Sequence, residues 1–174
     1  MAGCLLVGAC RRQEEIHVDE AVAAREASFD VPLPNGFELV QLRGEGSERM
    51  RAPSGARVER STRGFLVEAG PDFSVEVVPD AAPLSELVTP PGVSRVVSAE
   101  DAAVFESPDG GYSFVVVREL VPEWDEDRRH RLSCGSASGG VSGGVTRADR
   151  RGFSKAAAQI MVAACRTLEL PKLE

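Results

Sequence analysis

Alternating apolar and polar residues, the pattern of strands with one buried face, recur through the middle of the chain. Residues 73–78 show the alternation most clearly, because Phe, Val and Val there alternate with Ser and Glu. Residues 107–111, Ser-Pro-Asp-Gly-Gly between two apolar runs, indicate a hairpin. Strands are predicted at residues 37–42, 56–60, 65–69, 73–78, 102–106, 112–119 and 131–136. The pattern therefore predicts a mostly antiparallel sheet of about six strands.

A helical pattern follows near the C-terminal end. Ser154 can cap a helix over residues 155–168, most of which are good helix formers. Its apolar side consists of Phe153, Ala157, Ile160, Met161, Ala164, Cys165 and Leu168. Lys155, Gln159 and Arg166 fall on the opposite side at about 100° per residue. An amphipathic C-terminal helix packed on a sheet defines an α+β domain.

Two connecting segments are predicted from their turn and breaker residues. Residues 44–55 are rich in Gly, Pro and charge, and are predicted to be a loop. Residues 80–88 are predicted to form one short helix, capped by Asp80 and stopped by Pro90-Pro91-Gly92. The layout resembles small exported α/β sandwich domains of the PsbP-like group, which implies a fold and no particular function.

The first residues of the chain are uncharged and mostly apolar, and end in Val7-Gly8-Ala9-Cys10 before the charged Arg11-Arg12. The segment resembles the tail of a bacterial lipoprotein signal, in which an apolar run and two small residues precede the cysteine that takes the lipid. The resemblance implies lipidation at Cys10 and a protein tethered to a membrane in the cell envelope. Residues 1–10 are interpreted as a truncated signal, and a start upstream of Met1 would supply the missing positive region. The alternative is a short buried strand, or a disordered N-terminus, of a cytosolic protein.

The rest of the chain divides at a group of turn residues. Residues 11–34 are polar and Ala-rich, and are interpreted as a tether between the lipid and the domain. Pro32 and Pro34, followed by Asn35-Gly36, indicate the entry into the folded part. Residues 35–174 are predicted to form a single α+β domain.

The four cysteines, Cys4, Cys10, Cys134 and Cys165, fit an exported protein. Removal of Cys4 and lipidation of Cys10 would leave two cysteines in an oxidising compartment. A Cys134–Cys165 bridge is predicted to close a loop of about 32 residues and to contribute roughly 3–4 kcal/mol. The competing interpretation is a pair of reduced, buried thiols in a cytosolic protein.

The charge balance narrows the classes of partner. The net charge is -7 and the pI about 5.0, which argues against nucleic-acid binding. The basic run at residues 128–131 follows four acidic residues, so it is interpreted as part of a self-compensating charged loop. A second basic group comprises Arg147, Arg150 and Arg151.

Catalytic and cofactor motifs are weak. Gly140-Val141-Ser142-Gly143-Gly144 matches the nucleophile elbow of serine hydrolases, but a Gly/Ser-rich stretch precedes it where a strand is required. His130 precedes Ser142, whereas the histidine of an α/β-hydrolase follows the serine. No lysine follows Gly144 as a phosphate-binding loop requires. The preferred interpretation of residues 135–144 is a flexible loop, and neither catalytic residues nor a cofactor are predicted.

Metal binding is not predicted either. His17 and His130 are the two histidines, and neither lies near Cys134 or Cys165 at the spacing of a zinc finger. The acidic run at residues 125–127 lacks the alternating spacing of a calcium loop. It is interpreted as a solvated loop. Trp124, next to it, either contacts a partner or packs against the domain, and both interpretations stay open.

These patterns together predict a non-enzymatic, exported and lipid-anchored bacterial envelope protein. It is expected to bind an envelope protein or another cell-envelope component, or to have a structural role there. Two alternatives from other classes are a small exported serine hydrolase using Ser142 and a cytosolic protein-interaction domain.

Overall fold

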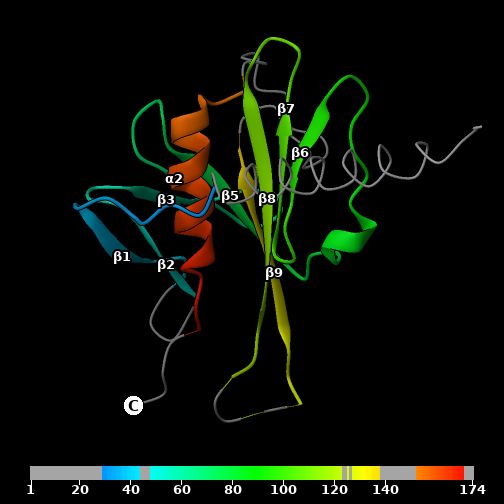
Figure 1. The fold of residues 1–174 in the computed structure, drawn as a ribbon. Coiled ribbons are helices and arrows are strands. Elements are labelled where there is room, and N and C mark those ends of the chain that lie inside the picture. The colour runs from blue at the N-terminus through cyan, green and yellow to red at the C-terminus, as the bar shows by residue number, and fades with distance from the viewer. Residues whose placement is uncertain (1–28, 44–47, 123–124, 126, 138–151, 171–174) are drawn as a thin grey trace, which may run out of the picture.

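Seven antiparallel strands form the main sheet, in the spatial order β3-β4-β5-β9-β8-β7-β6. In this computed structural model, which describes residues 29–43, 48–122, 125, 127–137 and 152–170, a two-stranded sheet lies beside it (Figure 1). The small sheet contains β1 (Phe37–Gln41) and β2 (Arg49–Pro53). The main sheet contains β3 (Arg57–Arg60), β4 (Phe65–Glu68), β5 (Ser74–Pro79), β6 (Ser94–Ser98), β7 (Ala102–Glu106), β8 (Tyr112–Leu120) and β9 (His130–Ser136).

One face of the main sheet packs against the helix α2 (Lys155–Arg166). The cap is as predicted, because the Ser154 hydroxyl accepts a hydrogen bond of 3.2 Å from the Ala157 N–H. Met161 and Leu168 are almost fully buried on the predicted apolar side. The expected α+β fold, with the C-terminal helix on an antiparallel sheet, is confirmed.

A disulfide joins this helix to the central strand of the main sheet. Cys134 of β9 and Cys165 of α2, the pair predicted from the sequence, are bonded with their Cα atoms 5.6 Å apart. Both cysteines are completely buried, and Cys134 lies between Val77 of β5 and Val116 of β8 in the register of the sheet. The bridge therefore fixes α2 over the middle of the sheet.

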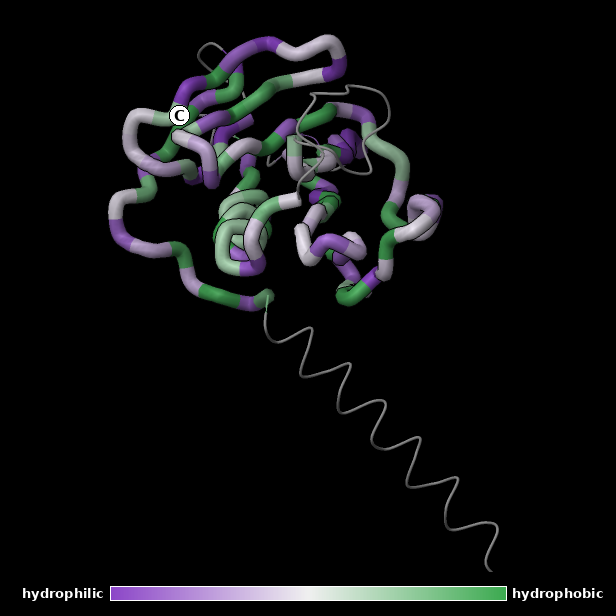
Figure 2. The backbone as a smooth tube through the Cα atoms, turned by 90° about the horizontal axis from the view of Figure 1, so that it is seen from above, coloured by the Kyte–Doolittle hydropathy of each residue, from purple (hydrophilic) through white to green (hydrophobic). Residues whose placement is uncertain are grey.

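The helix is buried on more than its predicted apolar stripe. Ala158 and Val162 are completely buried and Ala163 is 9% exposed, although they extend beyond that stripe. The cause is the segment of residues 29–36, which passes over the outer side of α2 (Figures 1 and 2). Its first residue, Phe29, is only 3% exposed and belongs to the core. Residues 29–34, the end of the predicted tether, thus lie against the domain.

Residues 49–53, expected to be part of a loop, form the strand β2 instead. Their sequence Arg-Met-Arg-Ala-Pro alternates, and Met50 and Ala52 are completely buried while Arg51 is exposed. The high charge of the segment concealed this period-2 signal. β2 also pairs with the chain after α2, since Arg49 and Glu169 exchange two backbone hydrogen bonds of 3.0 Å.

The connection between β5 and β6, residues 80–93, crosses the sheet face opposite α2. We call it the strap. It must cross, because β5 and β6 are separated by β9, β8 and β7 in the sheet. Of the short helix predicted at residues 80–88, only a 3₁₀ turn at Leu84–Glu86 forms. The predicted cap is wrong, because Pro83 is the residue before the turn and Asp80 has a φ of 54°. Pro83 explains the difference, because it restricts the residue before it and has no N–H for a longer helix.

We expect the double substitution C134A/C165A to lower the free energy of unfolding by about 3–4 kcal/mol, because the bridge restricts the unfolded chain between positions far apart in sequence. Urea unfolding without reductant measures the change. Dithiothreitol should destabilise the parent protein by a similar amount and leave the variant unaffected. Equal unfolding midpoints for the variant and the oxidised parent would contradict a stabilising role.

Candidate functional site

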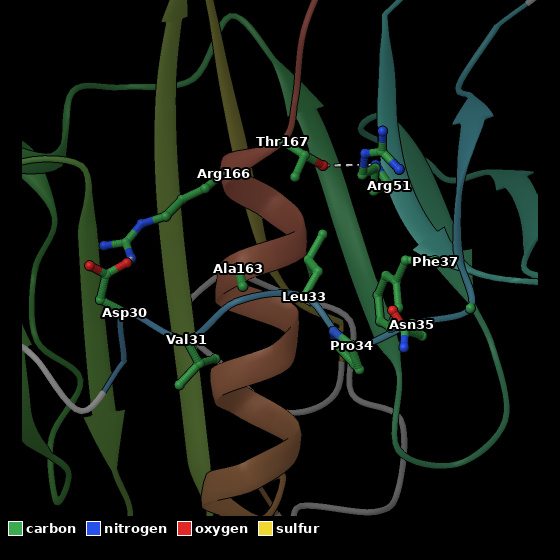
Figure 3. Close-up of a pocket in the computed structure, with 11 residues that line it drawn as sticks. Asp30, Val31, Leu33, Pro34, Asn35, Phe37, Arg51, Ala163, Arg166 and Thr167 are labelled. Carbon is green, nitrogen blue, oxygen red and sulfur yellow. Dashed lines mark hydrogen bonds and ion pairs between the residues drawn. The ribbon is translucent and has the colours of Figure 1, made fainter.

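A hollow of about 610 Å³ lies where residues 30–37, the strand β2 and the C-terminal end of α2 meet. We call it the bowl (Figure 3). It is within the size range of small-molecule sites. Its lining comes from three parts of the chain: residues 30–31 and 33–37, Arg51, and the helix-end residues Ala163, Arg166 and Thr167.

The bowl has an apolar side. Leu33, Pro34 and Phe37 contribute apolar side chains to its lining (Figure 3). Phe37 is held by an edge-on contact with the buried Phe73, with ring centroids 5.9 Å apart. Ala163 of α2 contributes a small apolar surface. This side can contact an aliphatic or aromatic part of a ligand.

The second side carries an ion-pair cluster centred on Arg166. Its guanidinium donates two hydrogen bonds to Asp101, from Nε at 2.9 Å and from Nη2 at 3.0 Å. Nη1 lies 3.6 Å from a carboxylate oxygen of Asp30 and donates to the Phe29 carbonyl at 3.4 Å. Arg166, expected on the solvated side of the helix, thus links α2 to the turn before β7 and to residues 29–30. A cation in the last turn is also favoured by the helix dipole.

Arg51 is the charged lining residue that this cluster does not neutralise. Its backbone N–H donates to the Thr167 hydroxyl at 2.7 Å, and that hydroxyl donates to the Ala164 carbonyl at 2.6 Å. These bonds fix the position of the Arg51 backbone beside the helix end. Its guanidinium is on an exposed residue and forms no ion pair within the described part of the chain. An uncompensated guanidinium next to apolar walls is suited to an anionic group on an apolar body.

The residues singled out in the sequence do not meet in the bowl. Cys134 and Cys165 form the disulfide beneath α2, and His130 is the half-buried first residue of β9. Several predictions concern positions outside the described residues: Cys4, Cys10, His17, Trp124, Ser142, Arg147, Arg150 and Arg151.

The arginines of the basic run at residues 128–131 pair with two acidic residues, one in the predicted charged loop and one on β8. Arg129 and Arg131 lie 3.2 and 3.8 Å from carboxylate oxygens of Glu119. Arg128 lies 3.7 Å from a carboxylate oxygen of Asp125. These arginines are therefore not available together as an anion site.

Within the described ranges, no group of three or more His, Cys, Asp or Glu side chains is placed to hold a metal ion. The helix α2, with 12 residues, is too short to cross a membrane. No family model matches the chain, and no curated protein matches it. The site has to be interpreted from its own chemistry.

Sequence reasoning did not find the bowl. Its lining residues come from two regions, residues 30–51 and 163–167, that lie more than a hundred positions apart, and the β2 alternation around Arg51 was the one local signal available. Alternation could have identified Arg51 as an outward residue beside buried Met50 and Ala52. It could not have placed Arg51 beside Thr167.

We expect Arg166→Ala to lower the free energy of unfolding by about 1–3 kcal/mol, because it removes two charge-assisted hydrogen bonds to a half-buried carboxylate. Hydrogen exchange measured by mass spectrometry should also become faster at residues 29–36. The control is Arg57→Ala on the exposed strand β3, which should change stability by less than about 0.5 kcal/mol. Unchanged exchange at residues 29–36 would show that Arg166 does not hold this segment.

Proposed function

We propose that this protein is an exported bacterial envelope protein, anchored through lipid on Cys10, that acts by binding rather than by catalysis. Its ligand is an anionic amphiphile of the cell envelope: a phosphate or carboxylate group joined to an apolar chain. The observation that carries the ligand class is Arg51, which lines the bowl together with apolar residues and forms no ion pair among the described residues.

Two observations support export and anchoring. The buried Cys134–Cys165 disulfide is typical of proteins that fold in an oxidising compartment. The sequence Val7-Gly8-Ala9-Cys10 resembles the end of a lipoprotein signal. The eighteen residues 11–28 between Cys10 and the buried Phe29 can span at most about 60 Å, so the anchor would keep the domain near the membrane.

The placement of the bowl supports the ligand class. Residues 30–37 form one of its walls and directly follow the segment that would lead from the anchor. Asp30 and Arg166 pair with each other, and Asp101 adds a second carboxylate to Arg166, so this cluster attracts no further anion. Arg51 is left to bind the anionic group, and Leu33, Pro34 and Phe37 to contact the apolar part.

Cys10→Ser should abolish lipidation when the protein is expressed from its own genomic region in a bacterial host. We expect the variant to lose incorporation of labelled palmitate and to leave the detergent phase on Triton X-114 partitioning. Cys4→Ser is the matched control, because in a processed lipoprotein this residue is removed with the signal. Labelling that persists in the Cys10 variant would refute the anchor.

Arg51→Ala should weaken binding of monododecyl phosphate, titrated below its micellar concentration, by about 10- to 100-fold. The reason is that a hydrogen bond to a charged group contributes about 1.5–3 kcal/mol, and each 1.4 kcal/mol is tenfold in affinity. Arg57→Ala, an exposed arginine of β3 outside the bowl, is the control and should bind as the parent does. Isothermal titration calorimetry measures both.

The same titration separates the ligand class from the anchor. Binding should weaken as salt is raised, and uncharged dodecyl maltoside should bind much more weakly than the phosphate. Equal affinities of the Arg51 and Arg57 variants would refute the bowl as the anion site. That result would leave the Cys10 experiment to decide the anchor separately.

A further inference from the structure

A second hollow, of about 310 Å³, lies on the opposite face of the sheet between the strap and the strands β8 and β9. We call it the cleft. Val115 and Val117 of β8 and Ser133 of β9 form its floor, and residues 81–84 and 86–88 of the strap form its roof. No residue lines both the cleft and the bowl.

The larger part of the cleft wall is apolar. Its roof includes Leu84, Leu87 and Val88, and its floor contributes the two valines of β8. Two charged residues line the cleft: Glu86 is exposed on the 3₁₀ turn of the strap, and Arg63 donates to Glu76 through its Nη2 at 2.5 Å. Glu76 also accepts a hydrogen bond of 2.7 Å from the Ser61 hydroxyl. The guanidinium at this edge is therefore already compensated, and the Glu86 carboxylate adds a negative charge, so an anionic ligand is disfavoured in the cleft.

The strap is held to the sheet by few interactions. The hydrogen bond from the Ala81 N–H to the Arg131 carbonyl, 3.2 Å long, is the only backbone hydrogen bond from strap to sheet among the described residues. The 3₁₀ turn Leu84–Glu86 contains no buried residue, and Val88 is 79% exposed. The apolar strap side chains thus lie over the sheet without the close packing of a core.

We infer that the cleft is a second binding site, which takes an uncharged aliphatic chain. The volume lies at the lower end of the range for small-molecule sites. An aliphatic chain would remove the apolar surfaces of strap and floor from water, and it would leave the ion pair between Arg63 and Glu76 intact. The Ser133 hydroxyl is the one polar side chain on the floor. This inference goes beyond the proposed function and does not depend on the anion site at Arg51.

The experiment uses the uncharged apolar dye N-phenyl-1-naphthylamine, whose fluorescence rises when it enters an apolar site, and 1-decanol as the competing chain. The parent protein should bind the dye, and decanol should displace it. Ser133→Leu fills the cleft from its floor and should weaken dye binding at least tenfold. Ser113→Leu is the matched control: it makes the same change on the same face of β8 outside the cleft, and should bind within twofold of the parent.

Each alternative outcome overturns the inference. Dye binding by the Ser133 variant equal to that of the parent would show that the dye does not occupy the cleft, as would failure of decanol to displace it. Loss of dye binding in Arg51→Glu would place the dye in the bowl. If Ser133→Leu lacks a cooperative unfolding transition, Leu87→Asp on the strap replaces it, since it puts a charge in the roof and leaves the sheet unchanged. Leu87→Asp should likewise weaken dye binding at least tenfold.

Discussion

The bond between Cys134 and Cys165 determines where α2 lies, and the other features of the helix side depend on that position. Cys134 is on the central strand of the main sheet, so the bridge holds the helix over the middle of the sheet. The two residues that follow Cys165, Arg166 and Thr167, are thereby fixed at the helix end. Arg166 donates hydrogen bonds to Asp101 and to the Phe29 carbonyl. The Thr167 hydroxyl accepts a hydrogen bond from the backbone N–H of Arg51. A covalent bond in the core thus positions the polar contacts at the rim.

The segment of residues 29–36 has two roles that support each other. Phe29 is buried and belongs to the same core cluster as Ala158 and Val162, the buried helix residues beyond the predicted apolar stripe. Leu33 and Pro34, a few residues later, form the wall of the bowl. Leu33 packs against the core, and the segment is tied to the helix through Arg166, so this wall is present before any ligand binds. A preformed wall lowers the cost of ordering a ligand.

Those parts of the fold that have a local period could be predicted from the sequence. The helix over residues 155–168 has a capping serine and a continuous apolar stripe, and most strands of the main sheet show alternation or a buried apolar run. The disulfide followed from the number of cysteines and the rim position of Cys165 on the helix. β2 was not predicted because the arginines on its exposed face resemble a charged loop. In the strap, one proline prevented the helix that the composition suggested.

The two hollows could not be predicted because each depends on how irregular segments cross regular layers. The strand order puts β9 between β5 and β8, so the chain has to cross one face of the sheet to reach β6. The other face carries α2 and, over it, residues 29–36 (Figure 1). A proline-containing segment without helical or strand structure does not present its side chains at a regular spacing, so they do not pack closely against the layer beneath. Gaps therefore remain under them, in contrast to the close packing between α2 and the sheet. The bowl and the cleft lie next to these two crossings, which is why the topology, rather than a sequence motif, places the candidate binding sites of this protein.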